Sequence, residues 1–226
     1  NSTFRMNVNG DPGPVHSNIE IAAEDSMFIF VEATVDPNNQ NNPFVITDFI
    51  EFTTNGNRQK VDLVAWGQNA IYFTPTRFSN VLPDFTCLTG PCSDTIPPVN
   101  VNWTKDLPYV IYGYVVVDSL DVLTIEAGSR IYFHQNGGLW VYRGGTLNVN
   151  GTKAEPVTFQ GDRLDAGFRD QPGQWDRIWI NEGGNNVINH AIIKNSFIGI
   201  QAEVSPFSEP PFSDPSSLQI TNTEIS

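Results

Sequence analysis

Short apolar triplets recur at a fixed interval in the middle of this chain, separated by glycine, asparagine and acidic residues. In the segment LTIEAGSRIYFHQNGGLWVYRGGTLNVNG, residues 123–151, successive triplets begin eight residues apart, at Leu123, Ile131, Leu139 and Leu147. Three triplets therefore make a repeat of 24 residues. Three short strands per repeat of about two dozen residues predict a parallel β-helix, in which each repeat is one coil and each triplet lies on one of three faces.

The same pattern continues toward the C-terminus. Further triplets begin at Val157, Ile178, Ile198 and Leu218, and a long excursion at 160–176 interrupts the spacing. The inward residues of each triplet would stack on those of the neighbouring coil, so the core is a column. We therefore predict a right-handed parallel β-helix over residues 109–226 that continues beyond the chain end.

The N-terminal part has a different pattern. Segments such as MFIFVEATV, FVITDFIEF and KVDLVAW within residues 1–73 alternate apolar and polar residues, as half-buried strands do. Asn55-Gly56 predicts a tight hairpin turn, and a polar loop is expected at 36–43. Several such strands favour a β-sandwich.

Residues 74–108 are rich in proline, which lacks the N–H that a strand ladder needs, and we interpret them as a linker. Cys87 and Cys92 lie in this segment on either side of the turn-forming pair Gly90-Pro91. We favour a disulfide over two free thiols. A disulfide that closes so small a loop would stabilise the folded chain by about 2 kcal/mol. A zinc site would need further ligands, and no histidine is near in sequence. A disulfide implies an extracytoplasmic compartment.

Composition narrows the possible partners. The net charge is −13 with 12 basic residues, which argues against nucleic acid, whose phosphates need neutralising. No apolar run is long enough to span a bilayer. We read the chain as an interior piece of a longer protein, so any lipid anchor would lie upstream of Asn1.

Several ordered motifs resemble the right-handed, pectate-lyase-like β-helix repeat proteins of bacterial envelopes. They are LTIEAGSRIYF, GGTLNVNGTKAEPVTFQGDR, PGQWDRIWI and NNVINHAIIKNSFIGIQ, within roughly residues 108–226. That family is often found as surface lipoproteins of unassigned function. One departure is Asp176-Arg177, where the family usually has a glycine pair, and this suggests a side-chain contact there. The N-terminal part, residues 1–73, is similar to ASH-type immunoglobulin-like domains, through Glu24-Asp25-Ser26, the following apolar strand Met27-Phe28-Ile29-Phe30, and Thr54-Asn55-Gly56. The resemblance implies an immunoglobulin-like β-sandwich that lacks its first strands.

Outward-facing aromatic residues are the first candidate site. If Leu139 and Ile178 point inward, then Trp140 and Trp179 point outward on the same face, one coil apart. Neighbouring strands are about 4.8 Å apart, so the two rings could form an exposed ladder that binds sugars or a partner protein. Tyr132 and Tyr142 are further candidates. The alternative is that the excursion at 160–176 or the linker folds over these rings.

Charged residues of the excursion are the second candidate. An acid-and-arginine site there would use a set of seven residues: Asp162, Arg163, Asp165, Arg169, Asp170, Asp176 and Arg177. The alternative is a solvated loop whose charges pair locally. His16, His134 and His190 are scattered, and we interpret them as turn or packing residues. We expect no metal and no cofactor.

The prediction for function is a non-catalytic surface or periplasmic protein of lipoprotein type, at the bacterial outer membrane or cell surface. It would dock an envelope or outer-membrane protein, as an accessory subunit of an outer-membrane assembly. One alternative is a glycan-binding module that uses the outward aromatics and binds polysaccharide. A second alternative is a polysaccharide lyase or hydrolase, which would need the excursion carboxylates to line a groove.

Overall fold

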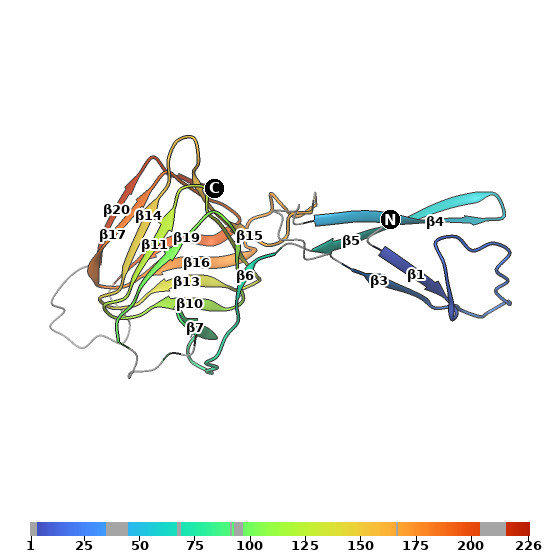
Figure 1. Ribbon diagram of the computed structural model, residues 1–226, viewed down its shortest axis with the longest axis horizontal. Helices are drawn as coiled ribbons and strands as arrows, with labels where there is room; N and C mark the ends of the chain where they lie inside the picture. The colour runs from blue at the N-terminus through green and yellow to red at the C-terminus, as the bar shows by residue number, and fades with distance from the viewer. Residues whose placement is uncertain are drawn as a thin grey trace. The chain divides into compact units, whose positions relative to one another are not determined.

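The computed structural model describes residues 4–34, 45–66, 69–90, 92, 97–165, 167–203 and 216–226. The polar loop expected at 36–43, and Pro91 of the expected turn, lie outside these residues. The described chain is all-β, as predicted, with strands β1 to β21 (Figure 1). It forms two compact units, Asn1–Asn69 and Ala70–Ser226, which we call unit 1 and unit 2. No helix among the described residues is long and apolar enough to cross a membrane.

Unit 1 contains two antiparallel sheets. In the first, β1 (Phe4–Val8) lies between β2 (Asp11–Pro12) and β3 (Ile29–Ala33). The second is a hairpin of β4 (Val45–Thr54) and β5 (Asn57–Trp66). The hairpin turns at Asn55 and Gly56, whose φ angles of 49° and 80° belong to the left-handed region that this dipeptide tolerates. The turn is therefore where the sequence predicts it.

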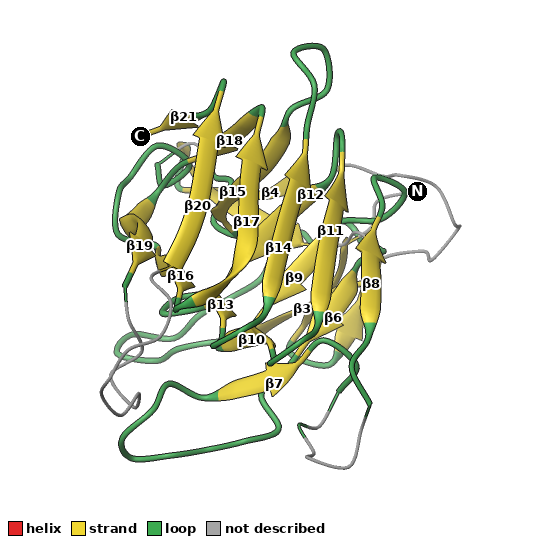
Figure 2. Ribbon diagram, turned by 90° about the vertical axis from the view of Figure 1, so that its left-hand side faces the viewer, coloured by secondary structure: helices red, strands yellow, loops and turns green. Residues whose placement is uncertain are grey.

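Unit 2 consists of three parallel sheets, in which each strand pairs with the strand three places later in the chain. Face I comprises β6 (Ile71–Phe73), β9 (Tyr109–Ile111), β12 (Arg130–Phe133), β15 (Val157–Gly161), β18 (Ala191–Ile193) and β21 (Glu224–Ile225). Face II comprises β7 (Phe85–Cys87), β10 (Tyr114–Val117), β13 (Gly138–Val141), β16 (Trp175–Ile180) and β19 (Ser196–Ala202). Face III comprises β8 (Asn100–Trp103), β11 (Val122–Glu126), β14 (Thr146–Asn150), β17 (Gly183–Asn189) and β20 (Ser216–Thr221), which run side by side in Figure 2. The chain thus winds from face to face as a parallel solenoid.

The register of the strands follows the repeat in the sequence. Leu123 pairs with Leu147, and Leu139 pairs with Ile178 despite the long excursion between them. All four side chains are fully buried in one core that runs through the coils. The 24-residue repeat is therefore the length of one coil, and the excursion leaves the solenoid without shifting its register.

The solenoid begins earlier than the sequence indicated, and this corrects the expected linker at 74–108. Three strands, β6, β7 and β8, pair in parallel with β9, β10 and β11 and so form a first coil. Proline removes a donor only at its own position, and the prolines flank these strands of three or four residues. The unit boundary accordingly lies between Asn69 and Ala70, ahead of the expected boundary after residue 73.

Candidate functional site

Trp140 and Trp179 form a stacked pair on face II. They are register partners on β13 and β16, with ring centroids 4.7 Å apart and ring planes 14° from parallel. Their neighbours along each strand, Leu139 and Ile178, lie in the solenoid core. The two indoles therefore belong to the outer side of the sheet.

The disulfide-bearing segment packs over the inner indole. Trp140 is 3% exposed and belongs to a second apolar cluster, which contains Cys87, Tyr114 and Val116 and is flanked by Leu82 and Phe85. The Phe85 ring meets the indole edge-on at a centroid distance of 6.1 Å, and the Tyr142 ring does so at 5.5 Å. The indole Nε1 donates to Asn181 Oδ1 at 2.7 Å. Trp140 is thus a buried, hydrogen-bonded residue of a satellite core.

Trp179 is half-buried. One ring face stacks on Trp140, and its register partner on the following strand, β19, is Gln201. Its Nε1 donates to Glu203 Oε1 at 2.7 Å. A sugar ring stacks on an open aromatic face, whereas rings stacked along a solenoid turn their edges outward. The pair therefore offers an edge with a carboxylate beside it.

The two tyrosine candidates lie apart from each other. Tyr142 follows β13 and packs against the Trp140 cluster, half-buried. Tyr132 lies on β12 of face I and is 6% exposed. Burial raises the pKa of the Tyr132 phenol. The four aromatic candidates are thus divided between two faces of the solenoid.

Asp176 and Arg177 make the side-chain contact that their departure from the family pattern suggested. Arg177 pairs with Asp176 at 2.9 Å, and the Tyr114 hydroxyl donates to the other oxygen of that carboxylate. The Tyr114 ring crosses the position of Gly138, where an added Cβ would come within 2.5 Å of it. Burial and the bond to Asp176 raise the pKa of Tyr114, so the phenol stays protonated as the donor.

Replacing Tyr114 with phenylalanine should reduce stability at pH 8 and matter less above pH 10. Folding raises the pKa of Tyr114. The contribution of its phenol to the free energy of unfolding is therefore complete below the ordinary pKa of 10.0 and falls as the pH rises above that value. Urea unfolding of wild type and Tyr114→Phe at pH 8 and pH 10.5 measures this. An equal stability difference at both pH values would contradict the assignment. Folding also raises the pKa values of three other tyrosines, but these residues are present in both proteins and do not affect the difference between them: Tyr109, Tyr112 and Tyr132.

Charges of the excursion pair locally. Arg163 Nε is 3.0 Å from Asp165 Oδ1, and its guanidinium lies 3.9 Å from the Phe168 ring centroid. Because Arg163 donates to it, the pKa of Asp165 lies below its ordinary value. Arg169 pairs with its neighbour Asp170 at 3.2 Å. These contacts match the alternative of a surface loop with locally paired charges.

The coiling brings Asp162, a residue of the predicted acid-and-arginine site, next to His134, which the sequence analysis interpreted as a turn or packing residue. His134 Nδ1 lies 2.7 Å from Asp162 Oδ2, and the imidazole packs at a tilt of 35° against the Tyr112 ring at a centroid distance of 4.6 Å. These three residues follow β9, β12 and β15 of face I at equivalent positions. The sequence interpretation missed the pair because 28 residues separate them. The signal was available, since both residues immediately follow a face I strand.

Cys87 and Cys92 form the predicted disulfide. The Arg77 guanidinium donates to the Cys92 carbonyl at 2.9 Å, and Cys87 packs in the Trp140 cluster. The cross-link therefore holds the segment that covers the indole.

Removing the disulfide in Cys87→Ser/Cys92→Ser should lower the free energy of unfolding by about 2 kcal/mol, because the unfolded chain regains the entropy of that loop. Urea unfolding under non-reducing conditions measures the loss. A reducing agent should bring wild type down to the variant and leave the variant unchanged. Equal midpoints for oxidised and reduced wild type would show that the bond contributes nothing.

Unit 1 differs from the solenoid in how few of its described large apolar side chains are buried. Among its described residues Val8 is buried, whereas Val15, Phe28 and Phe30 are 78%, 74% and 65% exposed. The other exposed ones are Ile19, Ile21, Val31, Phe49, Val61 and Val64. Exposed apolar clusters mark interaction surfaces in soluble proteins. Phe28 and Phe30 form such a cluster, and the exposed apolar side chains between Val15 and Val31 are therefore a candidate docking surface.

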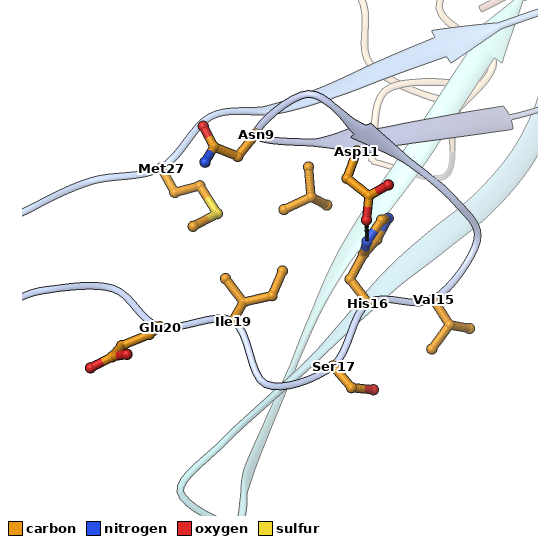
Figure 3. Close-up of a pocket in the computed structure, with 9 residues that line it drawn as sticks. Asn9, Asp11, Val15, His16, Ser17, Ile19, Glu20 and Met27 are labelled. Carbon is orange, nitrogen blue, oxygen red and sulfur yellow. Dashed lines mark ion pairs between the residues drawn. The ribbon is translucent and has the colours of Figure 1, made fainter.

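A hollow of about 450 Å³ opens in the same unit (Figure 3). Its lining combines apolar and acidic groups: Val8, Asn9, Asp11, Val15, His16, Ser17, Ile19, Glu20 and Met27. His16 is 3.4 Å from Asp11 and 3.1 Å from the Gly13 carbonyl. Asp11 and Glu20 stand at opposite ends of the lining in Figure 3.

Comparison with protein-family models, with curated proteins and with solved structures found no match for this chain. The site therefore has to be interpreted from its own geometry. Within the described residues, no group of three or more histidine, cysteine, aspartate or glutamate side chains is placed to hold a metal ion.

Proposed function

We propose that this chain is a non-catalytic docking protein of the bacterial envelope, in which unit 1 supplies the contact surface. The observation that carries the proposal is the contrast between the two units. Unit 2 has a continuous core in which residues such as Leu123, Leu139 and Leu147 are fully buried, whereas among the described large apolar residues of unit 1 only Val8 is buried and Phe28 and Phe30 are largely exposed. Covering such side chains with a partner removes apolar surface from water and lowers the free energy of the complex, so unit 1 is suited to a protein partner.

The compartment belongs to the same proposal. A disulfide persists in oxidising surroundings, and Cys87–Cys92 therefore supports an extracytoplasmic site, such as the periplasm or the cell surface. An accessory subunit of an outer-membrane assembly would present the docking surface in that compartment.

The finer assignment of the fold is also a proposal. Three parallel sheets with a coil-length repeat support a right-handed β-helix of the pectate-lyase-like class, since crossovers between parallel strands are nearly always right-handed. Two antiparallel sheets with exposed apolar faces support an incomplete immunoglobulin-like sandwich of the ASH type in unit 1.

The glycan and enzyme alternatives receive less support from the geometry. Trp140 is covered, and one ring face of Trp179 stacks on Trp140, so the pair does not present two open ring faces. The excursion carboxylates Asp162, Asp165 and Asp170 contact three different basic residues, His134, Arg163 and Arg169. Neither arrangement favours sugar chemistry over docking.

Affinity capture from cross-linked native envelopes tests the docking function. The wild-type chain should recover a stoichiometric envelope protein. Ile19→Ser/Ile21→Ser/Phe28→Ser, in unit 1, should lose it. The matched control Leu120→Ser/Phe168→Ser/Phe197→Ser removes three exposed apolar side chains from unit 2 and should retain it.

Two outcomes would contradict the proposal. Recovery of the wild-type chain alone would do so, and a polysaccharide array with Trp140→Ala and Trp179→Ala variants would then test the glycan alternative. Loss of the partner in the unit 2 control, with retention in the unit 1 variant, would move the docking surface to the solenoid.

A further inference from the structure

We propose that the partner docks on strand β3 by adding a strand to its free edge, and that this added segment is basic and apolar. The inference rests on the docking function proposed above, and it names the site and the partner chemistry. Its support comes from the position of β3 in its sheet, its side chains, the contrast with the hairpin, and the charge around it.

Strand β3 is an edge strand. The sheet order is β2-β1-β3, and all five residues of β3 pair with β1 in the antiparallel register Phe4↔Ala33 to Val8↔Ile29. Among the described residues no strand pairs with its other side. Backbone N–H and C=O groups on that side are available to an incoming extended chain, which is how strand addition obtains its affinity.

The side chains of β3, and of Phe28 directly before it, are those of a strand that is normally covered. Phe28 and Phe30 have ring centroids 6.3 Å apart and form one exposed aromatic surface. The segment MFIFVEA contains one charge, Glu32, and neither proline nor glycine. An exposed apolar edge of this composition is a template for pairing with another chain. Covering the edge of β3 with a partner strand would prevent such unspecific pairing.

The hairpin of the same unit is protected against such pairing. Strand β5 carries Arg58, Lys60 and Asp62 in alternate positions. Lys60 Nζ is 2.7 Å from Asp62 and lies 4.5 Å from the Phe49 ring centroid. Charges on an edge strand discourage a second strand from adding. Strand addition in unit 1 is thus directed to β3.

The charge of unit 1 selects the occupant. Its sequence has nine acidic and three basic residues, and Glu24, Asp25 and Glu32 flank the aromatic pair. A second copy of this chain would bring like charges together, whereas a basic segment would be attracted. The occupant we infer is therefore a partner strand with apolar residues facing Phe28 and Phe30 and with lysine or arginine at its ends.

The hollow provides a place for one of those basic side chains. Met27 lines it and directly precedes Phe28, whose carbonyl accepts from the Asn9 amide at 3.3 Å. The hollow therefore adjoins the start of β3. Asp11 and Glu20 supply two carboxylates there, and the apolar lining from Val8 and Ile19 suits the aliphatic stem of lysine or arginine.

Fluorescence anisotropy with two labelled peptides and the full chain tests the inference. Both peptides have an alternating valine–threonine centre, and one is flanked by lysines while the other is flanked by glutamates. The lysine-flanked peptide should bind the wild-type chain, and the glutamate-flanked peptide should bind at least about tenfold more weakly. Hydrogen exchange should show new protection across residues 28–33 when the lysine-flanked peptide is bound.

Variants locate the site. Phe28→Ala/Phe30→Ala should weaken binding of the lysine-flanked peptide by about tenfold or more, and Glu32→Lys by several-fold. The matched controls Phe49→Ala and Glu51→Lys alter an exposed aromatic and an exposed acid on the hairpin and should leave affinity within about twofold. A circular dichroism spectrum equal to that of wild type shows that each variant is folded.

The inference is overturned if neither peptide binds, if both bind equally, or if the hairpin variants lose affinity instead. A wild-type dimer that Phe28→Ala/Phe30→Ala dissociates would overturn it in favour of a second copy. The docking function can fail or stand separately. If Phe28→Ala/Phe30→Ala still captures the partner from cross-linked envelopes, docking stands and β3 is not its site.

Discussion

Replacing Phe133 with alanine is expected to lower the free energy of unfolding of the solenoid by about 3–5 kcal/mol, the usual cost of deleting a buried aromatic ring. Phe133 is fully buried, and its ring stacks on Trp175 at a centroid distance of 4.2 Å and on Phe159 at 6.5 Å. The cavity would open between consecutive coils, which stabilise each other only through neighbouring contacts. Urea unfolding followed by tryptophan fluorescence measures the loss.

The control for this substitution is Phe197→Ala. Phe197 belongs to the same unit and is 77% exposed, so its removal should change stability by no more than about 0.5 kcal/mol. Phe133→Leu should recover most of the stability, because leucine keeps much of the buried volume. Equal midpoints for Phe133→Ala and Phe197→Ala would show that the stacked column contributes little.

Replacing Gly184 with alanine is expected to cost about 3 kcal/mol, from a strained backbone and a steric clash together. Gly184 has a φ of +69°, and a Cβ there would lie 2.1 Å from the Gly145 carbonyl oxygen of the adjacent coil. The colliding atom belongs to the backbone, so a coil would have to shift to make room.

Gly167→Ala serves as the matched control for Gly184→Ala. Gly167 has no left-handed φ, and an added Cβ would meet no atom within 4 Å. Its unfolding midpoint should equal that of wild type. If Gly184→Ala unfolds at the wild-type urea concentration, then the close approach of the two coils is not a constraint on residue choice.

The candidate sites were only partly readable from the sequence. Strand alternation was enough to put Trp140 and Trp179 outside the core and next to each other, because both depend on period and register alone. Their accessibility was not readable, since the cover on Trp140 comes from Phe85 and Cys87, more than fifty residues earlier. The pairing of His134 with Asp162 likewise joins residues from consecutive coils.

The sequence by itself determined the periodic part of this protein. Apolar triplets at Leu123, Ile131 and Leu139 specify one coil, and Leu147 begins the next, because a solenoid repeats one local contact pattern between neighbours. The disulfide was also predictable from the sequence, because Cys87 and Cys92 are only five residues apart and their contact is local.

Tertiary structure alone decided the remainder. It drew β7 and β8 from a proline-rich segment into the first coil and buried Trp140 beneath that segment. Among the described residues, it also left β3 with no strand on its second edge. Each of these outcomes depends on which distant segment packs against a given surface. No local spacing encodes that choice, because the free energy of covering a side chain is the same whichever part of the chain covers it.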